Sequence, residues 1–165
     1  MADLKLLLGV CGLYCGACNH YRASFPEGMH LLKEAVRQGR KLEGFTCQGC
    51  RSDSLYIHPG CAQCKIRACA EGKGIIHCGL CPDFPCDQIK AFQEDGHIHH
   101  RDVLAHLEEL KIKGPDQWLT GEVQRWKCGC GASFSWYEVS CQHCGAPLAS
   151  YGPDPRMADW TQLGT

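Results

Sequence analysis

The chain has 165 residues, enough for one domain or a domain with a small appendage, and 15 of these residues are cysteines. The 44% hydrophobic content includes the 15 cysteines, and 19 glycines and 8 prolines favour turns, so we expect bound metal to contribute much of the stability. The formal net charge of −1 would fall to about −7 with three four-cysteine zinc sites, which argues against a general nucleic-acid-binding role.

The N-terminal segment joins a short apolar run to three closely spaced cysteines. The run Leu6–Val10 is far too short to span a membrane, and we expect a cytoplasmic protein. In that reducing compartment, dense cysteine pairs indicate metal or redox chemistry, and an odd cysteine total also argues against complete disulfide pairing. The next stretch, CGLYCGAC, carries Cys11, Cys15 and Cys18, one thiol fewer than most structural zinc sites use.

The first predicted helix covers about 25–38. The stretch SFPE has the spacing of a helix capping box, and Met29, Leu32 and Val36 then recur at helical spacing. We expect these apolar residues to serve packing and not chemistry. The basic residues in and after this segment, Arg51 among them, are interpreted as a solvated face.

Residues 45–86 are dense in cysteine and contain an internal repeat. The pattern C-x2-C-x4-C occurs at Cys61–Cys69 and again at Cys78–Cys86, which suggests two similar metal-binding turns. Between them, Lys65–Gly72 is a candidate helical turn and Ile75–His77 a candidate short strand. The spacing allows two sets of four ligands, between which cysteines could exchange: Cys47, Cys50, Cys61 and Cys64, and Cys69, Cys78, Cys81 and Cys86.

Three further helices are expected after this region. They cover 87–94, 101–113 and 115–126, and the second carries the strongest pattern, with Val103, Leu107 and Leu110 on one face. The third begins with proline, places Trp118 and Trp126 near its ends and is expected to be interrupted at Gly121. Between the first two helices, HIHH at 97–100 is interpreted as a polar linker, with opportunistic metal binding as the alternative.

The strongest motif lies near the C-terminus, in KCGCGASFSWYEVSCQHCGAPL. Ten residues separate Cys128-x-Cys130 from Cys141-x2-Cys144, and a glycine follows each pair. Two such knuckles direct four thiolates toward one ion, and the glycines permit the required turns. We therefore expect a four-thiolate zinc site in a zinc ribbon, with a short hairpin between the knuckles. A rubredoxin-like iron site is the chemical alternative.

The three tetrads together use twelve of the 15 cysteines and leave Cys11, Cys15 and Cys18. In one interpretation this triad is an open metal site whose fourth ligand is His20, His77, a water or a substrate, because reactive metal sites keep a position open. In the other, which we favour, Cys15 and Cys18 complete a structural tetrad with another CxxC pair and Cys11 is merely buried.

These motifs resemble a family of uncharacterised cysteine-rich prokaryotic proteins, a domain of unknown function thought to bind zinc. The resemblance rests on CGLYCGAC, CQGCR, CKIRACAEGKG and CGLCPDFPC, which fall at 11–18, 47–51, 64–74 and 78–86. The stretch RWKCGCG at 125–131 is similar to a C-terminal ribbon extension of some members. The resemblance implies metal binding and brings no known reaction or substrate. The CGC spacing is one residue shorter than the commonest ribbon knuckle.

Together these features predict a small, metal-stabilised α+β protein with a mainly helical cysteine-rich body, short hairpins or knuckles and a C-terminal zinc ribbon. The expected divisions are 1–114, 115–150 and a tail at 151–165. We expect about three to four zinc ions and a non-enzymatic binding or adaptor module with a protein partner, because no catalytic signature accompanies the knuckles. The alternative is an iron–sulfur or thiol redox protein, or an enzyme, with an open cluster at the N-terminal triad.

Overall fold

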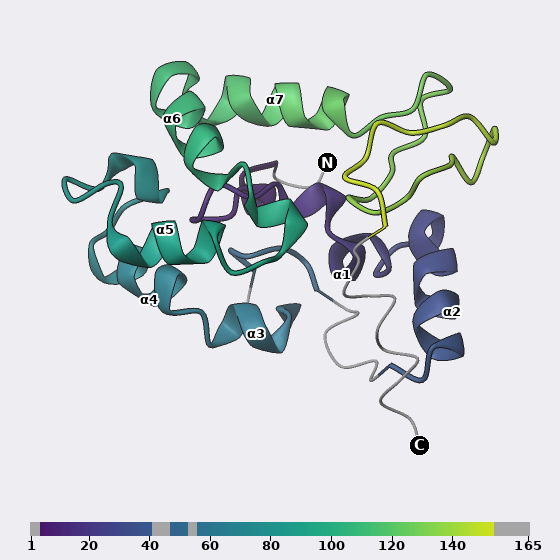
Figure 1. The fold of residues 1–165 in the computed structure, drawn as a ribbon, viewed down its shortest axis with the longest axis horizontal. Helices are drawn as coiled ribbons and strands as arrows, with labels where there is room; N and C mark the ends of the chain where they lie inside the picture. Colours follow the sequence, from purple (N-terminus) through teal and green to yellow (C-terminus); the bar gives the residue numbers. More distant parts are fainter. Residues whose placement is uncertain (1–3, 41–46, 53–55, 154–165) are drawn as a thin grey trace.

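The computed structural model describes residues 4–40, 47–52 and 56–153, which form a small, mainly helical, cysteine-rich protein (Figure 1). Its α-helices are α1 (Asn19–Arg22), α2 (Met29–Arg37), α3 (Pro59–Ala62), α4 (Lys65–Gly72), α5 (Asp87–Gln93), α6 (Val103–Lys113) and α7 (Pro115–Arg125). Short 3-10 helices join them: η1 (Leu4–Leu7), η2 (Cys15–Ala17), η3 (Pro26–Gly28), η5 (Cys78–Leu80) and η6 (Ile98–His100). The helical part of the predicted fold is thus confirmed.

Helices α6 and α7 cover the N-terminal segment. Figure 1 shows α7 above the purple N-terminal segment, with α4 and α5 on one side of the molecule and α2 on the other, below the C-terminal segment. As predicted, Val103, Leu107 and Leu110 form the buried face of α6, each at most 1% exposed. Trp118 and Leu119 of α7 join them in the same core. Burial of this apolar face positions the cysteine loops described below.

The observed helices differ from the predictions in three places. The structure puts Gly28, and not Ser24, at the N-cap of α2, because η3 occupies the first predicted turn. Met29 and Val36 are exposed and do not pack as expected, since Ala35 is the buried residue of this short helix. Gly121 does not interrupt α7, which runs unbroken from Pro115 to Arg125.

Extended strands are absent from the described residues, and the segment Ile75–His77 is a bend and not a strand. The β pairing consists of isolated antiparallel bridges, Leu8–Tyr14, Lys127–Ser133 and Ser140–Pro147. Each bridge closes a loop that carries at least one cysteine. In the described residues, the predicted hairpins are therefore present only as turns closed by single bridges, without paired strands.

The absence of a membrane span was expected from the sequence. Throughout 4–40, 47–52 and 56–153, every helix is too short or too polar to cross a bilayer.

The start of the predicted tail packs on the body. Tyr151, its first residue, packs on Trp126 with ring centroids 5.5 Å apart and donates its backbone N–H to Trp136 O at 2.9 Å. Residues 154–165 lie outside the described part of the chain, and the division at 114 and 115 stays a prediction.

Candidate metal centre

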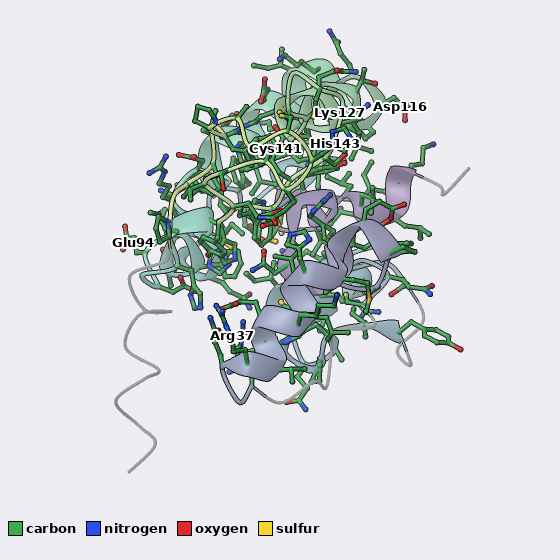
Figure 2. The ribbon with its side chains drawn as sticks, turned by 90° about the vertical axis from the view of Figure 1, so that its right-hand side faces the viewer. Arg37, Glu94, Asp116, Lys127, Cys141 and His143 are labelled. Atoms are coloured by element: carbon green, nitrogen blue, oxygen red, sulfur yellow. The ribbon has the colours of Figure 1, made fainter. Side chains whose placement is uncertain are left out.

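The C-terminal segment brings four cysteines together. The Sγ atoms of Cys128, Cys130, Cys141 and Cys144 all lie within 4.8 Å of one another. Cys128 Sγ and Cys144 Sγ are 3.6 Å apart, and Cys130 Sγ and Cys141 Sγ are 3.7 Å apart. A tetrahedral ion with Zn–S bonds of about 2.3 Å holds its thiolates about 3.8 Å apart. The four thiols therefore have the spacing of one tetrahedral four-thiolate site. In Figure 2, Cys141 is labelled within this segment, near His143 and Lys127.

Local hydrogen bonds build the two knuckles of this centre. The N–H of Cys128 donates to Ala132 O, and the N–H of Gly131 donates back to Cys128 O, both at 2.8 Å. The second knuckle repeats this pattern, with Cys141 N–H on Ala146 O and Gly145 N–H on Cys141 O at 2.8 Å. Gly131 and Gly145 have φ of +90° and +74°, a region that favours glycine. The glycine after each cysteine pair thus has the conformational role predicted for it.

The electrostatics of the four thiols suit a cation. Backbone N–H groups of Cys144 and His143 lower the pKa of Cys141 to about 6. The N–H of Ala146 lowers the pKa of Cys144, but the neighbouring thiols of Cys128, Cys130 and Cys141 together outweigh it and raise this pKa to about 12. One thiolate is therefore favoured while a full set of four repels itself, and a bound cation removes that repulsion.

The N-terminal triad is not isolated from the other cysteines. Burial, followed by the neighbouring Cys50, raises the pKa of both Cys11 and Cys15. Burial likewise raises the pKa of Cys18 to about 11, with Cys47 as its cysteine neighbour. Seven cysteines that sequence spacing placed in a triad and a tetrad are thus electrostatic neighbours: Cys11, Cys15, Cys18, Cys47, Cys50, Cys61 and Cys64.

The two histidines considered as a fourth ligand lie in different surroundings. His20 lies against His58, with ring centroids 4.2 Å apart, and burial followed by His58 lowers the pKa of His20 to about 3. His77 is 1% exposed, and its Nδ1 is buried without a hydrogen-bond partner. Within the described residues, neither histidine joins a group of three or more ligand atoms that all lie within 4.8 Å of one another.

The third predicted tetrad lines a cavity of about 30 Å³ between α4 and α5. Its walls include Ile66, Ile75, Phe84 and Ile89 together with all four cysteines of that tetrad, Cys69, Cys78, Cys81 and Cys86. Burial, followed by Cys86 and Cys69, raises the pKa of Cys78 to about 12. Lys73 Nζ lies 3.1 Å from Cys81 Sγ and 2.7 Å from Asp83 Oδ2, which places a cation beside one thiol. These four Sγ atoms are not all within 4.8 Å of one another.

Helix α6 holds two of the cysteine loops, a role that sequence reasoning missed. A Cβ on Gly12 would lie 2.9 Å from Leu107 Cγ, and a Cβ on Gly79 would lie 2.6 Å from Leu107 O. His106 Nδ1 lies 3.1 Å from Gly12 O. The N–H of Cys78 donates to Val10 O at 2.8 Å, so the two loops also bind each other. The glycines next to the cysteines, Gly12 and Gly79, are the sequence feature that could have indicated this close approach, because a residue without a side chain lets another element pack against the backbone.

Arg51 was predicted to belong to a solvated basic face, and this prediction is wrong. Its Nε donates to Leu8 O at 2.9 Å, and one of its terminal nitrogens donates to Ile76 O. Arg51 therefore joins the cysteine loop at 47–50 to the N-terminal segment and to the stretch before Cys78. The backbone carbonyls that it binds come from distant parts of the chain, and no local pattern identifies them.

Comparison with known proteins identifies the family. The model of a family described as "Protein of unknown function (DUF3795)" matches residues 7–91, just over half of the chain, so the chain belongs to the DUF3795 family. The match covers the N-terminal triad and the cysteine-rich centre, and it ends before the C-terminal four-cysteine centre. A search of curated proteins and a search of solved structures each found no match.

Proposed function

We propose that this protein binds zinc and works as a non-enzymatic binding or adaptor module. The observation that carries the proposal is the mutual approach of four thiols, from Cys128 to Cys144, to within 4.8 Å. Soft thiolates in a tetrahedral set of four select zinc or iron, and a site closed by four protein ligands is typical of structural zinc. Such an ion has no open position for a substrate, which supports a structural role.

The ion would hold the C-terminal segment against the helical body. Trp136 N–H donates to Ala17 O at 3.0 Å, and Arg22 Nη2 donates to Ser133 O at 2.6 Å. The segment also lines a cleft of about 590 Å³, to which Cys141 and Phe134 contribute together with Phe25 of the body. Loss of the ion would release this part of the lining. A protein partner is favoured over nucleic acid because thiolate-bound zinc makes the net charge more negative.

Elemental analysis and cobalt substitution test the proposal. We expect zinc in the purified protein, and in Co²⁺-reconstituted protein an intense thiolate-to-cobalt charge-transfer band with the visible bands of tetrahedral cobalt. Cys144→Ser should remove one metal equivalent and reduce these bands. His143→Ala, beside the ligand but outside the tetrad, should change neither. Equal metal content in wild type and Cys144→Ser would refute the proposed centre.

A second candidate function, an iron–sulfur or thiol redox protein, is supported by the body cysteines. The four thiols that line the cavity near Cys78 are not all within 4.8 Å of one another, unlike the C-terminal four. A [4Fe–4S] cluster binds each of its four thiolates to a different iron and so holds them farther apart than a single ion does. Protein purified without oxygen decides between the candidates. A brown protein with acid-labile sulfide would support the cluster, and a colourless protein with three or more zinc ions would exclude it.

A further inference from the structure

The turn between α5 and α6 contains a second group of metal-binding side chains, and none of them is a cysteine. One nitrogen from each of His97 and His100 and a carboxylate oxygen of Asp95 all lie within 4.8 Å of one another. Among the described residues, only this group and the C-terminal thiols satisfy that limit with three or more ligands. The group lies beyond residues 7–91, which match the family. Figure 2 places Glu94, the residue before Asp95, at the edge of the molecule and apart from Cys141.

The Asp95 carboxylate contacts the Nδ1 edge of both imidazole rings, whose centroids lie 4.7 Å apart. Its Oδ1 is 2.9 Å from His97 Nδ1, and its Oδ1 and Oδ2 are 3.0 Å and 2.9 Å from His100 Nδ1. Around an ion with bonds of about 2.1 Å, ligand atoms at right angles lie about 3.0 Å apart. The Asp95 carboxylate therefore already lies at the separation of an adjacent ligand from each histidine nitrogen, and the two nitrogens belong to the same group within 4.8 Å.

The backbone and the core hold these ligands in place. Gly96 has φ +85°, which allows the chain to reverse, and Asp95 Oδ1 accepts the backbone N–H of His97 at 2.9 Å. His100 is 7% exposed and stacks on Phe92 with ring centroids 3.8 Å apart. The backbone N–H of His100 donates to His97 O at 2.8 Å. A site whose ligands are held before binding loses less entropy when the ion arrives.

The third histidine of this turn, His99, lies edge-on to His100 with ring centroids 4.2 Å apart, but it is held by the C-terminal segment. The ring of His99 stacks on Trp136 with centroids 4.2 Å apart and planes 16° apart. Its Nδ1 forms a hydrogen bond with the hydroxyl of Tyr137. His99 thus faces the C-terminal segment while its neighbours face Asp95. Only two of the three histidines in this run would therefore be ligands, His97 and His100. His99 then provides a matched control for variants of the other two.

We propose that Asp95, His97 and His100 bind one divalent first-row transition-metal ion through two imidazole nitrogens and one carboxylate oxygen. Three protein ligands leave coordination positions for water or a small anionic oxygen ligand, as in metal sites that act on substrates. The Asp95 and His97 side chains are 31% and 44% exposed, so these positions open to solvent. Nitrogen and oxygen ligands also separate this site chemically from the thiolate centres, which prefer softer ions.

A Co²⁺ titration tests the proposal. Purified protein is passed over a chelating resin that leaves thiolate-held metal in place, and Co²⁺ is then added. We expect one equivalent to bind with a Kd below about 10 µM and to give weak visible bands without thiolate charge transfer. His97→Ala and Asp95→Asn should each weaken this binding by at least about tenfold. His99→Phe, which keeps a ring on Trp136, should bind as the wild type does.

Three results would overturn the proposal. Equal Co²⁺ binding by wild type and His97→Ala would place the ion elsewhere. Binding weaker than about 10 µM, or without a difference between His97→Ala and His99→Phe, would mean an adventitious ion only. Far-UV circular dichroism checks that each variant is folded. If Asp95→Asn fails this check, His97→Ala decides the question, because its side chain is 44% exposed and supports little of the core.

Discussion

The indole Nε1 of Trp126 donates a hydrogen bond to Glu122 Oε2 at 2.9 Å, one turn back along α7, and both residues are buried. Trp126 also packs edge-on against Phe134, with ring centroids 5.4 Å apart. The pair therefore joins the end of α7 to the segment that carries the four-cysteine centre. Arg125 Nη1, 3.5 Å from Glu122 Oε1, partly compensates the buried carboxylate.

Replacement of this carboxylate should destabilise the protein in a graded way. Glu122→Leu leaves the indole N–H without its acceptor, and we expect it to lower the free energy of unfolding by about 1–3 kcal/mol. Glu122→Gln keeps an acceptor oxygen and should cost less. Urea unfolding of metal-loaded protein measures both changes. If Glu122→Leu were as stable as Glu122→Gln, the hydrogen bond to Trp126 would not contribute.

Gly12 of the N-terminal cysteine loop should not tolerate a side chain. Its φ of +85° and the 2.9 Å approach of a Cβ to Leu107 Cγ both oppose any side chain. We expect Gly12→Ala to destabilise the protein by at least about 1–2 kcal/mol. Gly121→Ala is the control, because a Cβ in α7 would meet open space, and it should stabilise by about 0.5–1 kcal/mol. Thermal unfolding of the two variants would contradict this account if the shifts had the same sign.

The parts of the molecule that could be predicted from the sequence depend on local spacing. The C-terminal thiols meet because each knuckle is a short turn closed by its own glycine, such as Gly131. The buried face of α6 follows from apolar residues at helical spacing. The partition of the body cysteines is different, because Cys11 meets Cys50 only through the tertiary fold. The close approach of Leu107 to the N-terminal loop depends on that fold as well.

Glu138 should contribute more to stability than an ordinary surface carboxylate. Its Oε1 lies 2.5 Å from His30 Nε2, and its Oε2 accepts the backbone N–H of Ser135 at 2.6 Å. Glu138→Ala breaks both contacts, and we expect a loss of about 1–3 kcal/mol. Glu34→Ala is the matched control: its pair with Arg37 is exposed, and solvent screening leaves such pairs with little effect on stability. Equal unfolding midpoints in urea for the two variants would show that Glu138 does not fasten the C-terminal segment.

Cys11→Ser should affect the body of the protein and leave the C-terminal centre intact. Cys11 is half-buried and has Cys50, Cys64 and Cys78 as electrostatic neighbours, so this prediction takes it as one of a structural set of ligands. Serine is a poor ligand for soft metal ions, and the variant should lose body metal and unfold at lower urea concentration. Cys128→Ser should show the opposite pattern, with loss of one C-terminal ion and a body that keeps its metal. Metal-to-protein ratios and circular dichroism compare the two variants. If Cys11→Ser keeps its stability and changes only thiol reactivity, Cys11 belongs instead to an open, reactive site.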